Sequence, residues 1–205
     1  MKKKILIGFG ILFGVLVIAW ITAAPGEKFK SGDVFPTLNL MNIHGAEVKI
    51  PSSKSKWVHL QFRRFAGCPI CNLHLQSFVQ RNSEIEAAGI HEVVVFHSPK
   101  ESLLPFQGKF PFDVIGDPEK KLYEQFGVGS SIFSVLDVRV WPKMKEGNSI
   151  VDRPKGDPEG GPLGLPADFL VGSDGKIVAV HYGRHAYDQW SVDDVIQISK
   201  LGRIQ

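Results

Sequence analysis

The first residues of the chain combine a basic cluster with a long apolar segment. Residues 5–26 carry no charged side chain, and a helix over Ile5–Ala24 would be about 30 Å long, the thickness of a bilayer core. Because Lys2–Lys4 come directly before this segment, the positive-inside rule places them in the cytoplasm. The pattern predicts an anchor at residues 1–26 of a single-pass protein of the cell inner membrane, with the C-terminal domain outside the cytoplasm on the periplasmic side.

The alternative for this segment is a signal peptide. Cleavage after the small residues Thr22–Ala24 would release a secreted or periplasmic domain. The apolar segment is longer than a usual signal-peptide core of about 7–15 residues, and Pro25 would follow the cut, so both features favour a retained anchor. The spacing of Gly10 and Gly14 matches the G-x-x-x-G motif of paired membrane helices, which allows a homodimer.

After a polar linker at residues 27–31, short apolar stretches rich in β-forming residues alternate with helical patterns. The apolar stretches lie at Trp57–Phe62, Val93–Phe96 and Phe112–Ile115, and the helical patterns run over Pro69–Gly89 and Pro118–Phe126. Such alternation is typical of βαβ units, in which helices cover the faces of a sheet. It predicts an α/β domain over residues 32–205.

An irregular stretch at residues 129–162 separates these units from the end of the domain. It ends in a run rich in glycine and proline, and it predicts an insertion packed on the sheet together with a surface loop. Beyond it, Asp168–Val171 and Lys176–Tyr182 flank a four-residue turn, as in an antiparallel hairpin. Ser191 is the predicted N-cap of a last helix that reaches about Leu201.

Composition and charge narrow the classes of function. The 205 residues are 43% hydrophobic and 22% charged, as in ordinary globular proteins. Without the three N-terminal lysines, the 24 basic residues become 21, which equals the 21 acidic residues. A neutral domain lacks the basic face that binds a phosphate backbone, so no nucleic-acid partner is predicted. In an exported domain, the two cysteines can persist as a disulfide.

Three strand-to-helix junctions share a residue followed by proline: Cys68-Pro69, Ser98-Pro99 and Asp117-Pro118. Proline suits the first helical position because it has no N–H to leave unpaired, so the residue before it is predicted to be the N-cap. Ser98 with Glu101 fits a capping box. Cys68 in this position would hold its sulfur against free backbone N–H groups and the positive end of the helix dipole, which stabilise a thiolate.

The second cysteine, Cys71, follows one helical turn later and within reach of the first. A disulfide that closes so small a loop adds little stability, so the pair suits redox cycling better than structural cross-linking. We therefore predict that Cys68 is the nucleophile and Cys71 the resolving thiol. Arg63 and Arg64 precede the pair and can lower the pKa of the thiol further, although either can equally be a solvated charge at a strand end.

Zinc binding is the main rival chemistry for these residues. Cys68, Cys71 and His74 have the spacing of zinc ligands. A structural zinc site needs a fourth ligand, and the sequence has no second Cys-x-x-Cys, so neither a metal nor another cofactor is predicted. The other histidines at strand or loop positions are predicted to be structural; they are His44, His59, His91, His97 and His181.

Four motifs connect the domain with a known family: Gly32–Pro36 at its start, Phe62–Cys71 around the cysteines, Gly164–Val171 with the later Asp174-Gly175, and Tyr182–His185. In this order they resemble the peroxiredoxin-like members of the alkyl hydroperoxide reductase and thiol-specific antioxidant (AhpC/TSA) group. The resemblance covers nearly everything from Gly32 to the last helix. It implies a thioredoxin-like fold with a central mixed sheet flanked by helices, a hydroperoxide substrate, and a thiol electron donor that the sequence does not identify.

The chain departs from this family at two positions. Peroxiredoxins of the usual kind have Thr or Ser three residues before the peroxidatic cysteine, where this chain has Phe65. The arginine that they place three residues before the Phe of the later strand is here Pro166, which resembles instead the cis-proline that shapes the substrate groove of thioredoxin. Arg63, Arg64 and Arg184 are the candidates to replace that arginine.

The sequence therefore predicts a membrane-anchored, outward-facing thiol oxidoreductase of the peroxiredoxin-like type that reduces hydroperoxides with its two cysteines. The first alternative is a thioredoxin-like thiol-disulfide oxidoreductase that acts on protein disulfides, with Pro69 and Pro166 in its groove. The second is a non-catalytic anchored domain with a structural disulfide. Its docking surface would lie around Phe133, Trp141 and Trp190, although aromatic residues at such positions are more often core.

Overall fold

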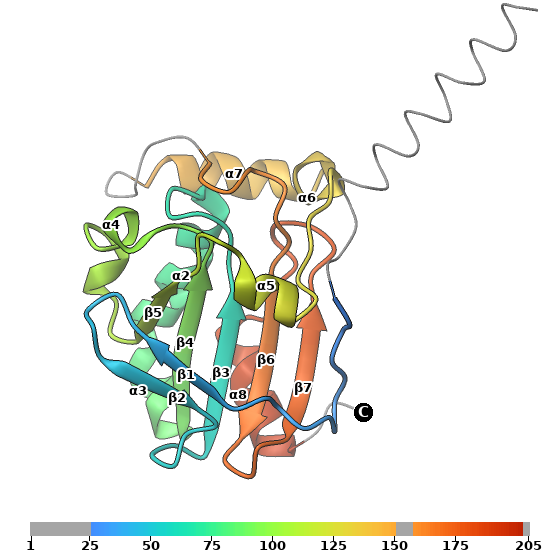
Figure 1. Ribbon diagram of the computed structural model, residues 1–205. Coiled ribbons are helices and arrows are strands. Elements are labelled where there is room, and N and C mark those ends of the chain that lie inside the picture. The colour runs from blue at the N-terminus through green and yellow to red at the C-terminus, as the bar shows by residue number, and fades with distance from the viewer. Residues whose placement is uncertain (1–25, 151–157, 203–205) are drawn as a thin grey trace, which may run out of the picture.

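The central sheet has five strands in the order β5-β4-β3-β6-β7 (Figure 1). The computed structural model describes residues 26–150 and 158–202. β4 runs parallel to β3 and β5, whereas β6 runs antiparallel to β3 and β7. This mixed sheet confirms the predicted α/β class. The strands are β3 (Trp57–Phe62), β4 (Ile90–Phe96), β5 (Asp113–Gly116), β6 (Ala167–Gly172) and β7 (Ile177–Tyr182).

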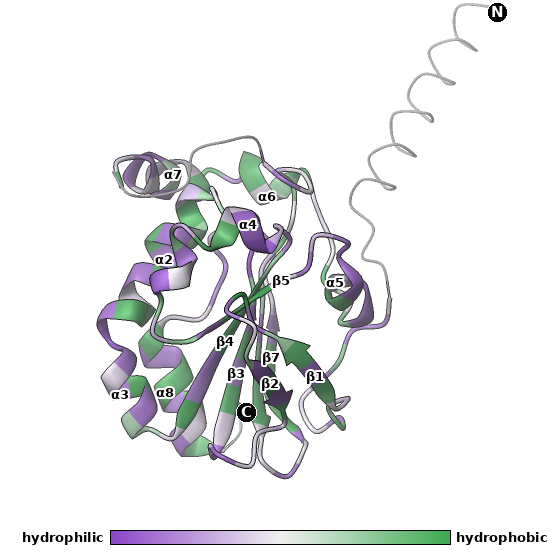
Figure 2. Ribbon diagram, turned by 60° about the vertical axis from the view of Figure 1, so that its left-hand side comes forward, coloured by the Kyte–Doolittle hydropathy of each residue, from purple (hydrophilic) through white to green (hydrophobic). Residues whose placement is uncertain are grey.

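Both faces of the sheet are covered (Figure 2). One face carries α2 (Pro69–Gln80), α3 (Asn82–Ala87) and α8 (Val192–Leu201). The opposite face carries α5 (Lys121–Gln125) and an antiparallel pair of short strands, β1 (Leu38–Met41) and β2 (Glu47–Ile50). Between β4 and β5 lie α4 (Lys100–Leu103) and a short 3-10 helix, η1 (Gln107–Lys109).

The central strand β3 sends different side chains to the two faces. Val58, Leu60 and Phe62 join the hydrophobic core under β1, β2 and α5. His59 and Gln61 are fully buried too, and the ring of His59 packs against rings from α2 and from the segment before α8. Because side chains alternate along a strand, β3 brings two polar groups into the layer beneath α2.

The capping box predicted for Ser98 and Glu101 is wrong. Pro99 stands at the N-cap position of α4, and no side chain caps that helix. The Ser98 hydroxyl instead accepts the N–H of Ala66 at 2.9 Å, in the loop before α2. A buried hydroxyl forms whichever hydrogen bond the packing offers, and here the partner comes from the neighbouring strand end.

Other predicted elements differ from the structure at their ends. The helix predicted at 118–126 shortens to α5, but the Asp117 carboxylate still accepts hydrogen bonds from its first two N–H groups, at 3.1 and 2.8 Å. The helix predicted over Pro69–Gly89 divides into α2 and α3 at Arg81. The sequence pattern predicts neither β1 nor β2, because each has four residues and at most two buried side chains.

The insertion at residues 129–162 is partly helical. Its two ends are joined by an antiparallel bridge between Ser130 and Gly164. α7 lies against α2, with Gly147 so close to Pro69 that a Cβ would collide with the Pro69 carbonyl group. Val140 of α7 also belongs to the hydrophobic cluster that includes Val94 of β4. The insertion therefore covers the end of the sheet at which α2 begins (Figure 1). Its helices are α6 (Phe133–Leu136) and α7 (Val140–Asn148).

The structure describes the predicted N-terminal linker but not the predicted anchor. The predicted anchor at residues 5–24 lies outside the described residues. In the part of the chain that the structure describes, no helix has the length and hydropathy needed to cross a bilayer. The predicted linker at residues 27–31 runs along the domain, and the ring of Phe29 packs on that of Phe126 with the centroids 5.3 Å apart.

Candidate redox site

The redox site lies at the N-terminus of α2, a few residues after β3. Cys68 has extended backbone angles (φ −61°, ψ 113°) and is the N-cap residue, and Pro69 is the first residue of the helix. The sulfur of Cys68 accepts a hydrogen bond from the N–H of Cys71 at 3.2 Å. The two cysteines form a disulfide across Cα atoms 5.3 Å apart. The predicted N-cap is confirmed: the N–H of Cys71 and the helix dipole favour a thiolate at the Cys68 sulfur, whereas the burial of this sulfur opposes one.

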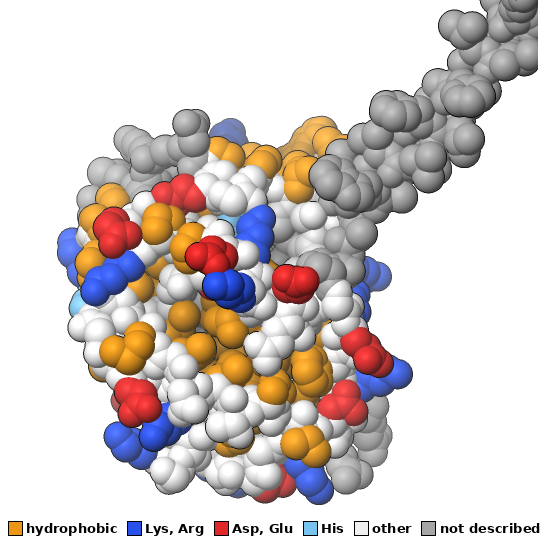
Figure 3. Space-filling model, viewed as in Figure 1, with side chains coloured by type: hydrophobic (Ala, Val, Ile, Leu, Met, Phe, Trp, Pro, Cys, Tyr) orange, Lys and Arg blue, Asp and Glu red, His pale blue; other side chains and the backbone are white. Residues whose placement is uncertain are grey.

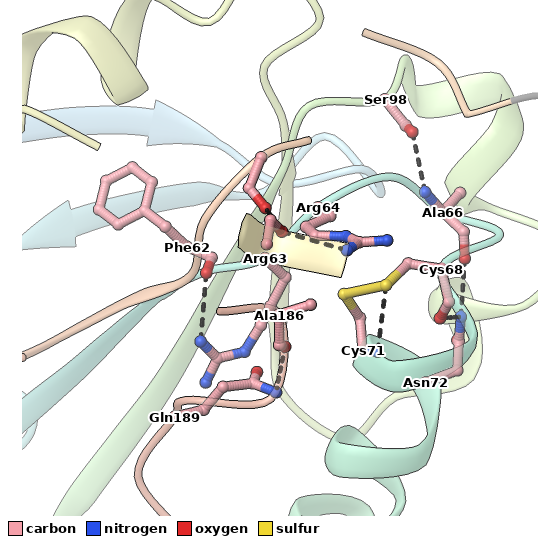
Figure 4. The surroundings of a disulfide bond; sticks show 12 residues. Phe62, Arg63, Arg64, Ala66, Cys68, Cys71, Asn72, Ser98, Ala186 and Gln189 are labelled. Carbon is pink, nitrogen blue, oxygen red and sulfur yellow. Dashed lines mark hydrogen bonds between the residues drawn. A yellow bond between two sulfur atoms is a disulfide. The ribbon is translucent and has the colours of Figure 1, made fainter. Parts of the chain in front are cut away.

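Polar side chains fix the loop before Cys68 (Figure 4). The amide of Asn72 donates to the carbonyl oxygens of Ala66 and Cys68 at 2.8 and 2.9 Å. Gln107 donates to the side-chain oxygen of Asn72 at 2.8 Å, and both amides are buried. No sequence motif marks these two residues. The only signal is one polar residue on a helix turn that is otherwise apolar.

Both cysteines are sealed from solvent. Cys68 is 0% exposed and Cys71 1% exposed. Both belong to a hydrophobic cluster that also takes side chains from the preceding loop, from α7 and from the loop after β7; these are Phe65, Val140, Met144, Ala186 and Tyr187. The insertion thus closes over the sulfurs. Because neither sulfur is exposed, a substrate or a reductant reaches them only when part of this cover moves aside.

The three candidate arginines lie in different places. Arg64 is among the side chains that surround the disulfide (Figure 4); burial lowers its pKa to about 10, so it remains a cation at neutral pH. Its guanidinium donates to the Ser134 hydroxyl of α6 at 3.4 Å. Arg63 turns into the core beneath α2. Arg184 is exposed and pairs with Asp188 at 3.4 Å. Of the three, Arg63 and Arg64 are drawn among the residues around the disulfide (Figure 4), and Arg63 is bound to Asp168.

Pro166 lies directly before β6 and is buried. Its carbonyl accepts the N–H of Gly183 at 2.9 Å, which ties the start of β6 to the end of β7. The likeness to the thioredoxin cis-proline is not upheld, because the peptide bond before Pro166 is trans. Among the peptide bonds of the described residues, the cis bond is Ile50-Pro51. Pro166 therefore lacks the cis peptide bond on which its likeness to the thioredoxin proline depends.

Beneath α2 lies a group of buried polar side chains, which we call the buried ionic cluster. Arg63 donates to Asp168 at 2.6 Å and to the side-chain oxygen of Gln61 at 2.5 Å. Gln61 donates in turn to Glu92 at 2.5 Å, and the same carboxylate binds His59 at 2.8 Å. Two acids are thereby paired with two bases, as buried charges require. The members are His59, Gln61, Arg63, His74, Glu92 and Asp168.

The cluster sets the charge of its members. Burial lowers the pKa of His59, but Glu92 and Asp168 outweigh this effect and raise the pKa to about 9. Burial raises the pKa of Asp168, but Arg63 and His59 bring it below its usual value. For His74, burial and then Arg63 lower the pKa well below its usual value. His59 is thus a cation and His74 is neutral, and Arg63 lies 3.3 Å from the ring nitrogen of His74 on α2.

The predicted zinc spacing is not assembled as a metal site. The sulfurs of Cys68 and Cys71 are bonded to each other, and the His74 ring nitrogen interacts with Arg63. In residues 26–150 and 158–202, no group of three or more His, Cys, Asp or Glu side chains could hold a metal ion.

His97, directly after β4, is another buried histidine. Burial first and Lys120 second lower its pKa to about 4, so its ring is neutral at neutral pH. The backbone at Gly160 and Gly164 lies so close to this ring that a Cβ at either position would crowd it. His97 therefore supports the C-terminal part of the insertion, a structural role that agrees with the sequence prediction.

The fold and the site together define a class of protein. A mixed sheet, a proline-led helix after its central strand, and a disulfide from the N-cap of that helix to its first turn characterise a thioredoxin-like thiol oxidoreductase. The chain belongs to the AhpC/TSA antioxidant enzyme family, whose sequence profile matches residues 77–185. The match begins within α2, after both cysteines, and extends past β7. The matched segment therefore contains neither cysteine.

Solved structures with this fold include several peroxiredoxins. Peroxidoxin BcpB from Mycobacterium tuberculosis has a TM-score of 0.62 at 17% identity, over 86% of this chain and 99% of that one. A peroxiredoxin-like protein from Aquifex aeolicus also has a TM-score of 0.62 at 17% identity, over 88% and 92% of the two chains. Peroxiredoxin Q from Xanthomonas campestris has a TM-score of 0.56 at 18% identity, over 80% and 90%. A comparison with curated protein sequences finds no match.

Proposed function

We propose that the protein is a membrane-anchored thiol peroxidase in which Cys68 reacts with a hydroperoxide and Cys71 resolves the product. The observation that carries this proposal is the position of the Cys68 sulfur at the N-cap of α2, hydrogen-bonded to a backbone N–H and bonded to Cys71. A sulfur in this position is stabilised as the thiolate, which is the nucleophilic form. Membership in a family of antioxidant enzymes supports a peroxide as the oxidant.

The reaction proceeds in two steps on the reduced protein. The Cys68 thiolate attacks one oxygen of the hydroperoxide, so that an S–O bond forms, the O–O bond breaks, and the leaving alkoxide takes up a proton as the alcohol. The Cys71 sulfur then attacks the resulting sulfenic acid, the disulfide forms, and water leaves. One hydroperoxide is reduced for each pair of thiols oxidised. A dithiol electron donor then reduces the disulfide by thiol-disulfide exchange.

Arg64 is the side chain that can stabilise both the thiolate and the leaving oxygen. It is one of the residues drawn around the disulfide in Figure 4. It is 2% exposed, and its Nε atom has no hydrogen-bond partner among the described residues. A buried cation with a free donor favours negative charge nearby. We therefore assign to Arg64 the role of the arginine that peroxiredoxins of the usual kind have where this chain has Pro166.

Thiol-disulfide exchange on protein substrates is the second candidate, and Phe65 favours it. This residue stands where a peroxiredoxin of the usual kind has Thr or Ser to orient the peroxide. Two features of the structure favour the peroxidase: the bond before Pro166 is trans, and the sulfurs are covered by the insertion. A small hydroperoxide needs a smaller opening than a protein disulfide does.

The proposed location is the periplasmic side of the cell inner membrane. Residues 5–24 form the single-pass anchor, and the three lysines before them favour a cytoplasmic N-terminus. The domain then lies in a compartment where disulfides persist. This location supports the disulfide as the resting state, from which a membrane-bound or periplasmic dithiol donor regenerates the thiols.

Stopped-flow oxidation of the reduced full-length protein tests the catalytic proposal. We expect hydrogen peroxide and an alkyl hydroperoxide to oxidise the protein much faster than they oxidise free cysteine, and a scrambled protein disulfide to react more slowly. Cys68→Ser should abolish the reaction, and Cys71→Ser should stop at a sulfenic acid that dimedone labels. Peroxide rates no faster than those of free cysteine, or full activity in Cys68→Ser, would refute the proposal.

A further inference from the structure

Hydrophobic side chains gather on the outer surface of the insertion. Of the eight large hydrophobic side chains that are exposed in the described residues, four lie between residues 133 and 141. Figure 3 shows hydrophobic side chains at the top of the molecule, where Figure 1 has α6. We call these four the insertion patch; they are Phe133, Leu136, Val138 and Trp141, exposed by 60%, 56%, 71% and 58%. An exposed apolar patch of this kind marks contact with another body.

The charged residues around the insertion patch suit a lipid surface. Asp137 binds Arg139 at 2.6 Å and Glu146 binds Lys143 at 2.9 Å, so both acids in α6, α7 and their connection are paired with a base. Lys145, also on α7, leaves an excess of positive charge. Tryptophan and basic residues at the edge of an apolar patch are typical of segments at the interface of membrane and water.

Few residues separate the insertion patch from the point at which the first described residues contact the domain. Glu27 lies against the backbone of Gly127, and six steps of chain, at most about 22 Å, lead from there to Phe133. If residues 5–24 span the bilayer, two steps, at most about 7 Å, separate Gly26 from the end of the span. The headgroup layer is about 5–8 Å thick on each side of the hydrocarbon core. These lengths allow the insertion patch and the end of the span to lie at the same lipid surface.

A second copy of the chain is less suited to cover this patch. Four side chains at these exposures offer roughly 400 Å² of apolar surface. A stable protein interface buries about 800 Å² on each partner and requires a complementary shape. A lipid surface adapts its shape to the protein, and binding strengthens with every apolar side chain that enters it. The area therefore favours lipid.

We propose that the insertion patch docks on the bilayer in which residues 5–24 are anchored, with its side chains among the headgroups. This inference rests on the anchoring in the proposed function. α7 of the insertion belongs to the hydrophobic cluster that contains Cys68 and Cys71. Docking therefore places this part of the redox site near the lipid surface.

Tryptophan fluorescence of the full-length protein in vesicles tests the docking. The vesicles consist of phosphatidylcholine and phosphatidylglycerol, with or without bromine on the acyl carbons near the headgroup. The difference between wild type and Trp141→Phe isolates the emission of Trp141. The difference between wild type and Trp57→Phe is the matched control, because Trp57 begins β3 at the opposite end of the sheet. We expect brominated lipid to quench Trp141 by about half and to leave Trp57 unchanged.

Each other outcome identifies which proposal fails. If the protein floats with the vesicles but Trp141 is unquenched, the docking proposal is wrong, and cross-linking shows whether a second copy covers the patch instead. If the protein does not float with the vesicles, the anchor is wrong and docking fails with it. The catalytic proposal is decided separately by Cys68→Ser, because this variant retains both tryptophans.

Discussion

Gly147 of α7 lies against the carbonyl group of Pro69, so closely that a Cβ would overlap with it. In most helices, replacing glycine by alanine stabilises the protein by about 1 kcal/mol. Here we expect Gly147→Ala to push α7 away from α2, at a cost of about 1–3 kcal/mol in the closed arrangement. The disulfide should then be reduced by dithiothreitol about tenfold faster, because the population with α7 moved aside increases. Stopped-flow reduction of the oxidised protein measures this rate.

Gly108→Ala is the matched control for this variant. A Cβ at Gly108 meets only the side chains of His44 and Leu104, at ordinary contact distances. Its reduction rate should equal that of the wild type. If Gly147→Ala is reduced no faster than Gly108→Ala, then α7 does not limit access to the sulfurs, and the loop after β7 is the cover that moves.

The buried ionic cluster predicts a large effect of a single change. Arg63→Met leaves Asp168 as a buried carboxylate without its main partner, which costs about 3–5 kcal/mol of unfolding free energy. Urea unfolding measures this loss, provided that the denaturant slope stays constant. Arg184→Met removes an arginine that is exposed and should have little effect. The double variant Arg63→Met with Asp168→Leu should regain part of the loss; a double variant as unstable as the single one would contradict the pairing.

The strand β3 shows where sequence-based prediction of this fold succeeds and where it stops. The stretch Trp57–Phe62 is predicted with the bounds that the structure has, because β-forming apolar residues are a local signal. The burial of His59 and Gln61 is not local. It depends on Glu92 and Asp168, which come from two other strands. The residue pattern within β3 cannot indicate that carboxylates from other strands lie beside it. The sequence therefore predicts a structural role for His59 but does not predict that its ring is positively charged.

In the redox site, too, the sequence predicts the local feature and misses the one that depends on distant residues. Cys68-Pro69 predicts an N-cap because the two residues are adjacent and the constraint on proline is local. The cover over the sulfurs is harder to predict, because α6 has four residues and α7 contains both Pro142 and Gly147. Helices of this composition are weak by themselves. α7 is stabilised by its contact with α2, which only the folded chain provides.

The raised pKa of His59 predicts how stability depends on pH. The pKa is about 9 in the folded protein, against the usual 6.5 that applies in the unfolded chain. Below pH 6.5 both states are protonated, and the stabilisation by Glu92 and Asp168 is fully present. As the pH rises from 6.5 to 9, only the folded state keeps the proton, so this stabilisation is progressively lost. The free energy of unfolding should therefore fall over this range. In His59→Gln the fall should be smaller, and an equal fall in both proteins would show that other groups cause it.

The buried charge of Arg64 leads to a prediction for the pKa of the Cys68 thiol in the reduced protein. A cation close to a thiol lowers its pKa. Arg64, which Figure 4 draws near the disulfide, remains charged because its own pKa is about 10. We therefore expect Arg64→Gln to raise the pKa of the Cys68 thiol by at least about 1. The pH dependence of iodoacetamide alkylation in the Cys71→Ser background measures this pKa without interference from the second thiol. Arg184→Gln, which changes an exposed arginine bound to Asp188, is the control and should leave the alkylation profile unchanged. Equal profiles for the two variants would mean that the N-terminus of α2 alone sets the reactivity of Cys68, and that Arg64 serves only to hold α6 through Ser134.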